Sequence, residues 1–189
     1  FHMLEDGGFA VITKEDVLIF DNTGTKVDRD ELKIDATATA TTKGDYKHFM
    51  EKEIYEQPEC IGNSINGRLG ENDVLDNVFG LGSSDAFREV KRIQFVACGT
   101  SLHAAKTARK WFEDICEIPC YIDFASEYRY RNPIVENNTL FVTISQSGET
   151  ADTLAALNYA KEEKYIGIVS ICNVPTSTMA RESDWKDRK

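Results

Sequence analysis

The sequence lacks the features of a membrane protein and of a nucleic-acid-binding protein. Among its 189 residues no apolar run approaches the ~20 residues that a membrane-spanning helix needs. Basic residues are also in deficit: 22 Lys and Arg stand against 32 Asp and Glu, for a formal net charge of −10. A nucleic-acid or acidic-membrane surface would require a clustered basic patch. We therefore expect no nucleic acid and no membrane as a partner, although this charge leaves room for a local anion pocket.

Cysteine and histidine are too sparse to predict a metal site or a disulfide framework. The five cysteines are an odd number, and three of them lie in or beside apolar segments. Cys116 and Cys120 are close in sequence, but no second Cys or His pair stands at ligand spacing. His48 has no Cys, Asp or second His at helical spacing, so we interpret it as a packing or surface residue. With no secretory leader evident, we expect reduced thiols, a cytoplasmic protein, and neither metal nor cofactor.

The composition, with 41% hydrophobic and 29% charged residues, is typical of a globular domain with a packed core. The first part of the chain predicts only small elements. In order, we expect strands over 9–13 and 17–20, a linker over 35–42, a helix from residue 44 that falters at 57–58, a short helix over 61–65, and a glycine-rich loop stretch up to residue 82. A lone hairpin is marginal in water. We place a domain boundary at the Ala- and Thr-rich linker.

From residue 91 onward, strands and helices alternate. We expect strands over 93–97, 120–124, 140–144 and 165–171, and helices over 101–115, over 126–130 and after Thr150. Unbroken apolar strands separated by amphipathic helices predict an α/β fold, a parallel sheet with right-handed crossovers and helices on both faces. In such sheets, ligands bind beyond the carboxyl ends of the strands.

The strand-to-helix turn over 145–150 is the strongest candidate for a ligand site. Ser145, Ser147 and Thr150 supply hydroxyl donors, Gln146 supplies an amide, and Gly148 lets a ligand approach the backbone. The first N–H groups of the following helix have no intrahelical partners and attract anions. The alternative is that Ser147 or Thr150 only caps that helix. A cap needs one hydroxyl and this turn has three, so we favour a phosphate site.

A second turn, over 98–101, also follows a predicted strand and contains hydroxyls. Because it lies at the same kind of position, the two turns could converge on one ligand.

Several long segments resemble the glutamine:fructose-6-phosphate amidotransferases, also called glucosamine-6-phosphate synthases. Those that are similar to the first sugar-isomerase (SIS) subdomain of this family lie at 98–101, 118–120, 125–131, 145–154 and 171–175. Residues 46–58 resemble its inter-domain helix, and residues 4–7 with the hairpin resemble the last strands of its glutaminase domain. The resemblance runs from about Leu4 to Asp184, and several motifs in the right order make it specific.

The resemblance implies an enzyme of two halves. A glutaminase domain releases ammonia, and an isomerase domain of two SIS subdomains uses it to convert fructose 6-phosphate into glucosamine 6-phosphate. Matched by position, the residues that hold the sugar phosphate are Ser101, Ser145, Gln146, Ser147 and Thr150, and those that line the pocket are Cys98, Gly99, Thr100 and Gly148. Cys98 is interpreted as a core thiol or pocket wall. Glu149 is expected in the first turn of the helix rather than as a base, because an anion at a phosphate would repel it. The resemblance also implies a homodimer through the SIS domain.

The same resemblance predicts that much of the enzyme lies outside this sequence. We expect residues 1–34 to be the end of a glutaminase-like domain, 35–90 a linker with inter-domain helices, and 91–189 a truncated first SIS subdomain, lacking its last strand and leaving an unpaired edge. The glutaminase nucleophile and the lysine, glutamate and histidine of the second SIS half are not expected here. We therefore predict no catalytic residue and no activity for this chain alone. The alternative is a stand-alone SIS module that binds or senses sugar phosphates without catalysis; the hairpin and the helix over 46–58 favour the enzyme.

Overall fold

The computed structural model describes residues 2–31, 42–76 and 78–186. The chain divides into two compact units, Phe1–Cys60 and Ile61–Lys189. The predicted linker over 35–42 lies outside the described residues except for Thr42.

The first unit contains a three-stranded antiparallel sheet. Its strands are β1 (Phe9–Ile12), β2 (Val17–Phe20) and β3 (Lys26–Val27), in that spatial order. The predicted hairpin is confirmed, but the prediction missed β3, which continues it. The turn before β3 is closed by Asp21, whose Oδ1 accepts hydrogen bonds from the N–H groups of Thr23 (2.8 Å) and Thr25 (2.9 Å). A strand of two residues has no alternation that a sequence pattern could reveal.

The helix of this region begins later than predicted, at Phe49, and includes the segment over 61–65 that was predicted as a separate helix. α2 runs without interruption over Phe49–Ile65 and includes Pro58, so the expected break at 57–58 is wrong. Proline removes one backbone hydrogen bond and costs a helix interior about 3 kcal/mol. Helix-favouring neighbours such as Glu56 and Glu59 act against that break. His48, directly before α2, is exposed, as a surface residue would be.

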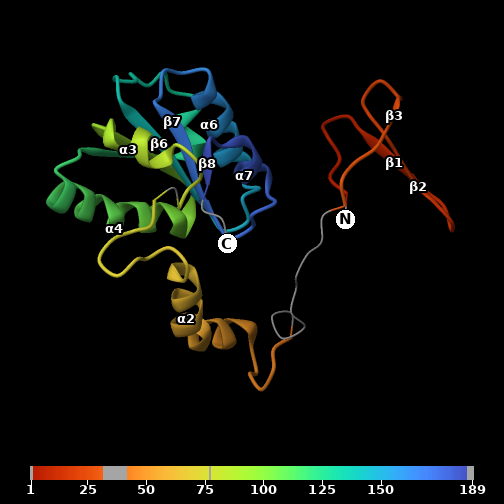
Figure 1. The fold of residues 1–189 in the computed structure, drawn as a ribbon, viewed down its shortest axis with the longest axis horizontal. Helices are drawn as coiled ribbons and strands as arrows, with labels where there is room; N and C mark the ends of the chain where they lie inside the picture. The colour runs from red at the N-terminus through yellow and green to blue at the C-terminus, as the bar shows by residue number, and fades with distance from the viewer. Residues whose placement is uncertain (1, 32–41, 77, 187–189) are drawn as a thin grey trace. The chain divides into compact units, whose positions relative to one another are not determined.

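The second unit is built on a five-stranded sheet, and all its strands are parallel (Figure 1). The spatial order is β5-β4-β6-β7-β8, with β4 at Arg92–Ala97, β5 at Cys120–Phe124, β6 at Thr139–Ser145, β7 at Gly167–Cys172 and β8 at Trp185–Lys186. The helices are α3 (Ser83–Arg88), α4 (Gly99–Cys116), α5 (Ala125–Tyr128), α6 (Ala151–Lys161) and α7 (Thr178–Glu182). The predicted parallel α/β sheet is therefore confirmed, whereas α3, α7 and β8 were not predicted.

Helices cover both faces of this sheet (Figure 1). Successive side chains of a strand point to opposite faces, and β4 shows this clearly. Val96 packs with Phe141 and Leu157 in the cluster under α5, α6 and α7. Ile93 and Phe95 pack on the other face, in the cluster that includes Ala105 and Phe112 of α4. β4 and β6 lie in the middle of the sheet between these two clusters, which fixes the positions of the turns that follow them.

A short strand that the sequence did not predict, β8, pairs with β7 in parallel. Trp185 of β8 lies edge-on to the ring of Phe87, with 5.7 Å between ring centroids, and its Nε1–H donates to the carbonyl oxygen of Leu81 (3.3 Å). The indole also covers Gly167: a Cβ there would lie 2.2 Å from the ring. One aromatic side chain thus holds a strand too short for the sequence pattern to reveal.

Candidate functional site

The two predicted turns follow neighbouring strands. In the parallel pairing of β4 with β6, Ala97 lies opposite Ile144. Cys98 and Ser145 are the next residues of the two strands, so both turns begin at the carboxyl edge of the sheet. The structure therefore brings the two groups of predicted site residues together at this edge, which is where ligands bind in open α/β sheets.

The turn over 145–150 is folded around its own first hydroxyl. Ser145 is buried, and its Oγ accepts the N–H of Gly148 (3.1 Å) and lies 3.3 Å from Oγ1 of Thr150. Gly148 has a φ of +69°, a conformation that glycine adopts at low cost. Gln146 and Ser147 are exposed at the tip of the turn.

Capping does not account for the hydroxyls of this turn. Thr150 occupies the N-cap position of α6, but its side chain makes no capping hydrogen bond. Oγ of Ser147 accepts the N–H of Glu149 (3.2 Å), which precedes the helix. In α7, by contrast, the N-cap Ser177 does accept the N–H of Ala180 (3.3 Å). The start of α6 thus keeps the unpaired N–H groups that bind anions.

The helix that follows the turn over 98–101 also begins without a side-chain cap. Cys98 is the N-cap of α4 and makes no side-chain capping bond, and Gly99, with a φ of +56°, begins the helix. Within the described part of the chain, the hydroxyls of Thr100 and Ser101 have no hydrogen-bond partner. Cys98 is half-buried and packs against the cluster under α5, α6 and α7, in agreement with its interpretation as a core thiol or pocket wall.

Glu149 does not lie where the sequence predicted. It precedes the N-cap of α6, and its Oε1 accepts the N–H of Thr178, the first residue of α7, at 2.7 Å. The acidic residue in the first turn of α6 is Asp152, paired with Arg129 at 3.6 Å. The expectation failed because α6 begins at Ala151, two residues after Glu149. The partner of Glu149 was not foreseen because α7 was not predicted, although Ser177 directly before it is a typical N-cap residue.

Two groups with strongly raised pKa values lie toward the amino ends of the strands, away from the two turns. Burial raises the pKa of the Cys120 thiol to about 11, and Cys120 is the first residue of β5. Burial also raises the pKa of Tyr128, whose hydroxyl contacts that of Tyr165, shortly before β7 begins. These groups belong to the core rather than to the candidate site.

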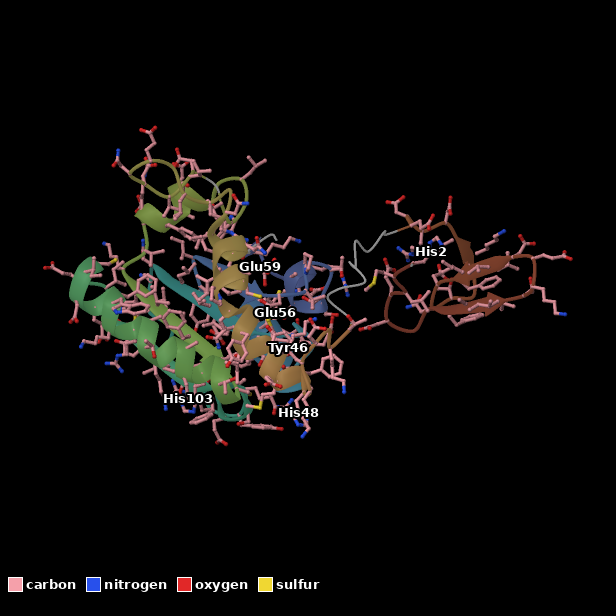
Figure 2. The ribbon with its side chains drawn as sticks, turned by 90° about the horizontal axis from the view of Figure 1, so that it is seen from below. His2, Tyr46, His48, Glu56, Glu59 and His103 are labelled. Atoms are coloured by element: carbon pink, nitrogen blue, oxygen red, sulfur yellow. The ribbon has the colours of Figure 1, made fainter. Side chains whose placement is uncertain are left out.

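The histidines do not cluster with one another. Figure 2 labels His2, His48 and His103 on three separate segments, and all three are exposed. Across residues 2–31, 42–76 and 78–186, no three His, Cys, Asp or Glu side chains are grouped to hold a metal ion. No helix within those ranges is long and apolar enough to cross a membrane. An apolar cavity of about 320 Å³ lies on the α4 face, and its lining of side chains such as Phe95, Phe112 and Val142 suits no phosphate.

A parallel sheet with helices on both faces and two donor-rich turns at its carboxyl edge defines an open α/β protein, the class in which ligands bind at that edge. The model of the SIS domain family matches residues 86–186, more than half of the sequence, and the chain belongs to this family.

Relatives in other organisms resemble the chain along almost its whole length. It is 50% identical over 184 residues to the glutamine–fructose-6-phosphate aminotransferase (isomerizing) of Pseudomonas putida, and 48% identical over 185 residues to that of Vibrio parahaemolyticus. These alignments cover 97% and 98% of this chain but only 30% of each relative. The solved C-terminal domain of glucosamine-fructose-6-phosphate aminotransferase from Francisella tularensis superimposes with a TM-score of 0.75 and 46% identity, covering 77% of this chain and 41% of that one. The chain thus corresponds to a segment of such a protein.

Proposed function

We propose that this chain is the sugar-phosphate-binding part of the isomerase domain of a glutamine–fructose-6-phosphate aminotransferase. The observation that carries the proposal is the pair of neighbouring turns whose helices, α4 and α6, begin without side-chain caps. The similarity to the aminotransferases also extends to the residues before the SIS domain, which favours the enzyme over a stand-alone binding module.

The ligand in this proposal is the phosphate of fructose 6-phosphate or glucosamine 6-phosphate. Its oxygens accept hydrogen bonds from hydroxyls, an amide and the first backbone N–H groups of α6, which together hold a dianion without a cationic side chain. The donors are Ser101, Ser145, Gln146, Ser147 and Thr150, with Cys98, Gly99, Thr100 and Gly148 forming the wall.

The complete reaction belongs, in this proposal, to a full-length protein of which this chain is a segment. The chain itself carries no catalytic residue and is inactive alone. The full-length protein works in the cytoplasm and forms a homodimer through its SIS domain.

Calorimetric titration tests the proposed site. We expect the chain to bind glucosamine 6-phosphate and fructose 6-phosphate, and not unphosphorylated glucosamine. Ser147→Ala and Thr150→Ala should each weaken binding by about 1 to 3 kcal/mol, the range for losing a hydrogen bond to a charged group. Thr150→Ala removes no capping bond and only the neutral bond between its hydroxyl and Oγ of Ser145 (3.3 Å), so the unfolding temperature should fall only slightly.

Thr107→Ala is the matched control. Thr107 lies on the exposed side of α4, and its hydroxyl donates to the carbonyl oxygen of His103 (3.1 Å), away from both turns. The control should bind as the wild-type chain does. Equal affinity for glucosamine and its phosphate would exclude the proposed site.

A further inference from the structure

The turn over 145–150 is attached to the segment that leads into α7. The N–H of Asn173 donates to the carbonyl oxygen of Gln146 (3.3 Å), and that of Met179 donates to the carbonyl oxygen of Gly148 (3.1 Å). The third bond is the one from Thr178 to the carboxylate of Glu149 (2.7 Å). The turn is therefore held from the β7 side of the sheet as well as by β6.

Glu149 differs from the other two attachments because it uses a side chain. A backbone carbonyl is present whatever the residue, whereas this acceptor depends on the identity of residue 149. The bond is charge-assisted, and such bonds are about twice as strong as neutral ones. Of the three attachments, it is also the shortest.

The position of the charge needs an explanation, because residue 149 lies between two residues proposed to bind phosphate. A carboxylate free to turn toward a phosphate would repel it. Bonded to α7, the carboxylate is committed to Thr178 and satisfies an N–H group that the helix itself leaves unpaired. Ser177 satisfies the N–H of Ala180 in the same way. The start of α7 is thus capped twice, once by its own serine and once by the turn.

The turn and the start of α7 are also packed closely at Gly148. A Cβ at Gly148 would lie 2.1 Å from Oγ of Ser177 and 2.5 Å from its Cβ, so the turn and α7 touch with no space between them. A change at the start of α7 is therefore transmitted directly to the turn.

We propose that Glu149 is a positioning residue: by binding the start of α7 through Thr178, its carboxylate fixes the turn over 145–150 in the conformation that presents the hydroxyls of Ser147 and Thr150 to a phosphate. This inference rests on the proposed function for the identity of the ligand. The conformation of the turn itself can be measured without any ligand.

The test compares Glu149→Ala and Glu149→Gln with the matched control Glu182→Ala. Glu182 is an exposed acid at the other end of α7 that pairs with Lys161. Hydrogen exchange of the ligand-free chain is measured at the hydrogen-bonded amides of Gly148, Thr178 and Met179. We expect Glu149→Ala to speed exchange at these amides about tenfold or more, the change that follows from losing a hydrogen bond to a charged group. Glu182→Ala should leave them unchanged.

Titration with glucosamine 6-phosphate gives the second readout. Glu149→Ala should bind about tenfold more weakly, whereas Glu149→Gln, whose amide oxygen still accepts the N–H of Thr178, should stay within about threefold of wild type. Failure of the wild-type chain to bind would refute the proposed function, and the positioning role would then be decided by the exchange rates alone. The inference would be overturned if Glu149→Ala left the amide exchange rates unchanged, or if it bound the sugar phosphate as tightly as wild type or more tightly. It would also be overturned if both variants lost binding together with a lower unfolding temperature, because that result would indicate a loss of folding.

Discussion

Gly148 occupies the most restricted position in the candidate site. Its φ of +69° lies in the left-handed region, and Ser177 leaves no space for a side chain. Both constraints act at once, which is why a glycine rather than an asparagine suits this point of the turn.

Substitution at this glycine should reveal both constraints. Gly148→Ala should lower the free energy of unfolding by about 2 to 4 kcal/mol, combining the left-handed conformation with overpacking. Gly99→Ala is the control, because Gly99 shares the positive φ but has open space around its Cβ position, and it should cost only about 1 to 2 kcal/mol. Urea denaturation measures both values. Equal losses in the two variants would mean that the contact with Ser177 contributes nothing.

The sequence predicted those site residues whose position depends only on their neighbours along the chain. The hydroxyls of Ser145 and Thr150 follow an apolar run and precede a helix, so their place at the carboxyl edge could be read from the sequence. The partner of Glu149 could not, because it lies 29 positions away, as the numbers of Glu149 and Thr178 show. Side-chain contacts between distant segments leave no periodic pattern.

At the scale of elements, length and periodicity decided what the sequence revealed. β4, β5, β6 and β7, with α4, α5 and α6 of the second unit, were predicted to within a few residues. β3 and β8 contain two residues each and α7 contains five, too few to show a pattern. The prediction for α2 failed for a different reason. Pro58 was expected to end the helix, whereas the helix continues past it among helix-favouring residues.

The two-residue strand β8 offers a test of how such short elements are stabilised. Trp185→Ala should destabilise the second unit by about 2 to 3 kcal/mol, because it removes the ring that covers Gly167 and contacts Phe87. The other tryptophan, Trp111, is 60% exposed on α4, and Trp111→Ala should cost less than about 1 kcal/mol. Thermal unfolding followed by circular dichroism compares the two. A similar loss in both variants would mean that β8 is not held by its indole.

At the scale of the whole molecule, the chain joins an SIS unit to a segment of different architecture. The first unit has a small antiparallel sheet and most of α2, and the second has the parallel sheet with the candidate site. The chain spans about a third of the length of the curated relatives that it matches. All the residues proposed to bind phosphate nevertheless lie within the second unit, so binding should not require the rest of the aminotransferase.

Nuclear magnetic resonance tests this claim most directly. Glucosamine 6-phosphate is titrated into the ¹⁵N-labelled chain, with glucosamine as the control, and the amide shifts are followed residue by residue. We predict saturable shifts concentrated at residues 99–101 and 147–151, the starts of α4 and α6, and no comparable shifts with glucosamine. Shifts that are equal for both sugars, or that are absent from these two turns, would contradict the assignment of the sugar-phosphate site to the carboxyl edge of this sheet.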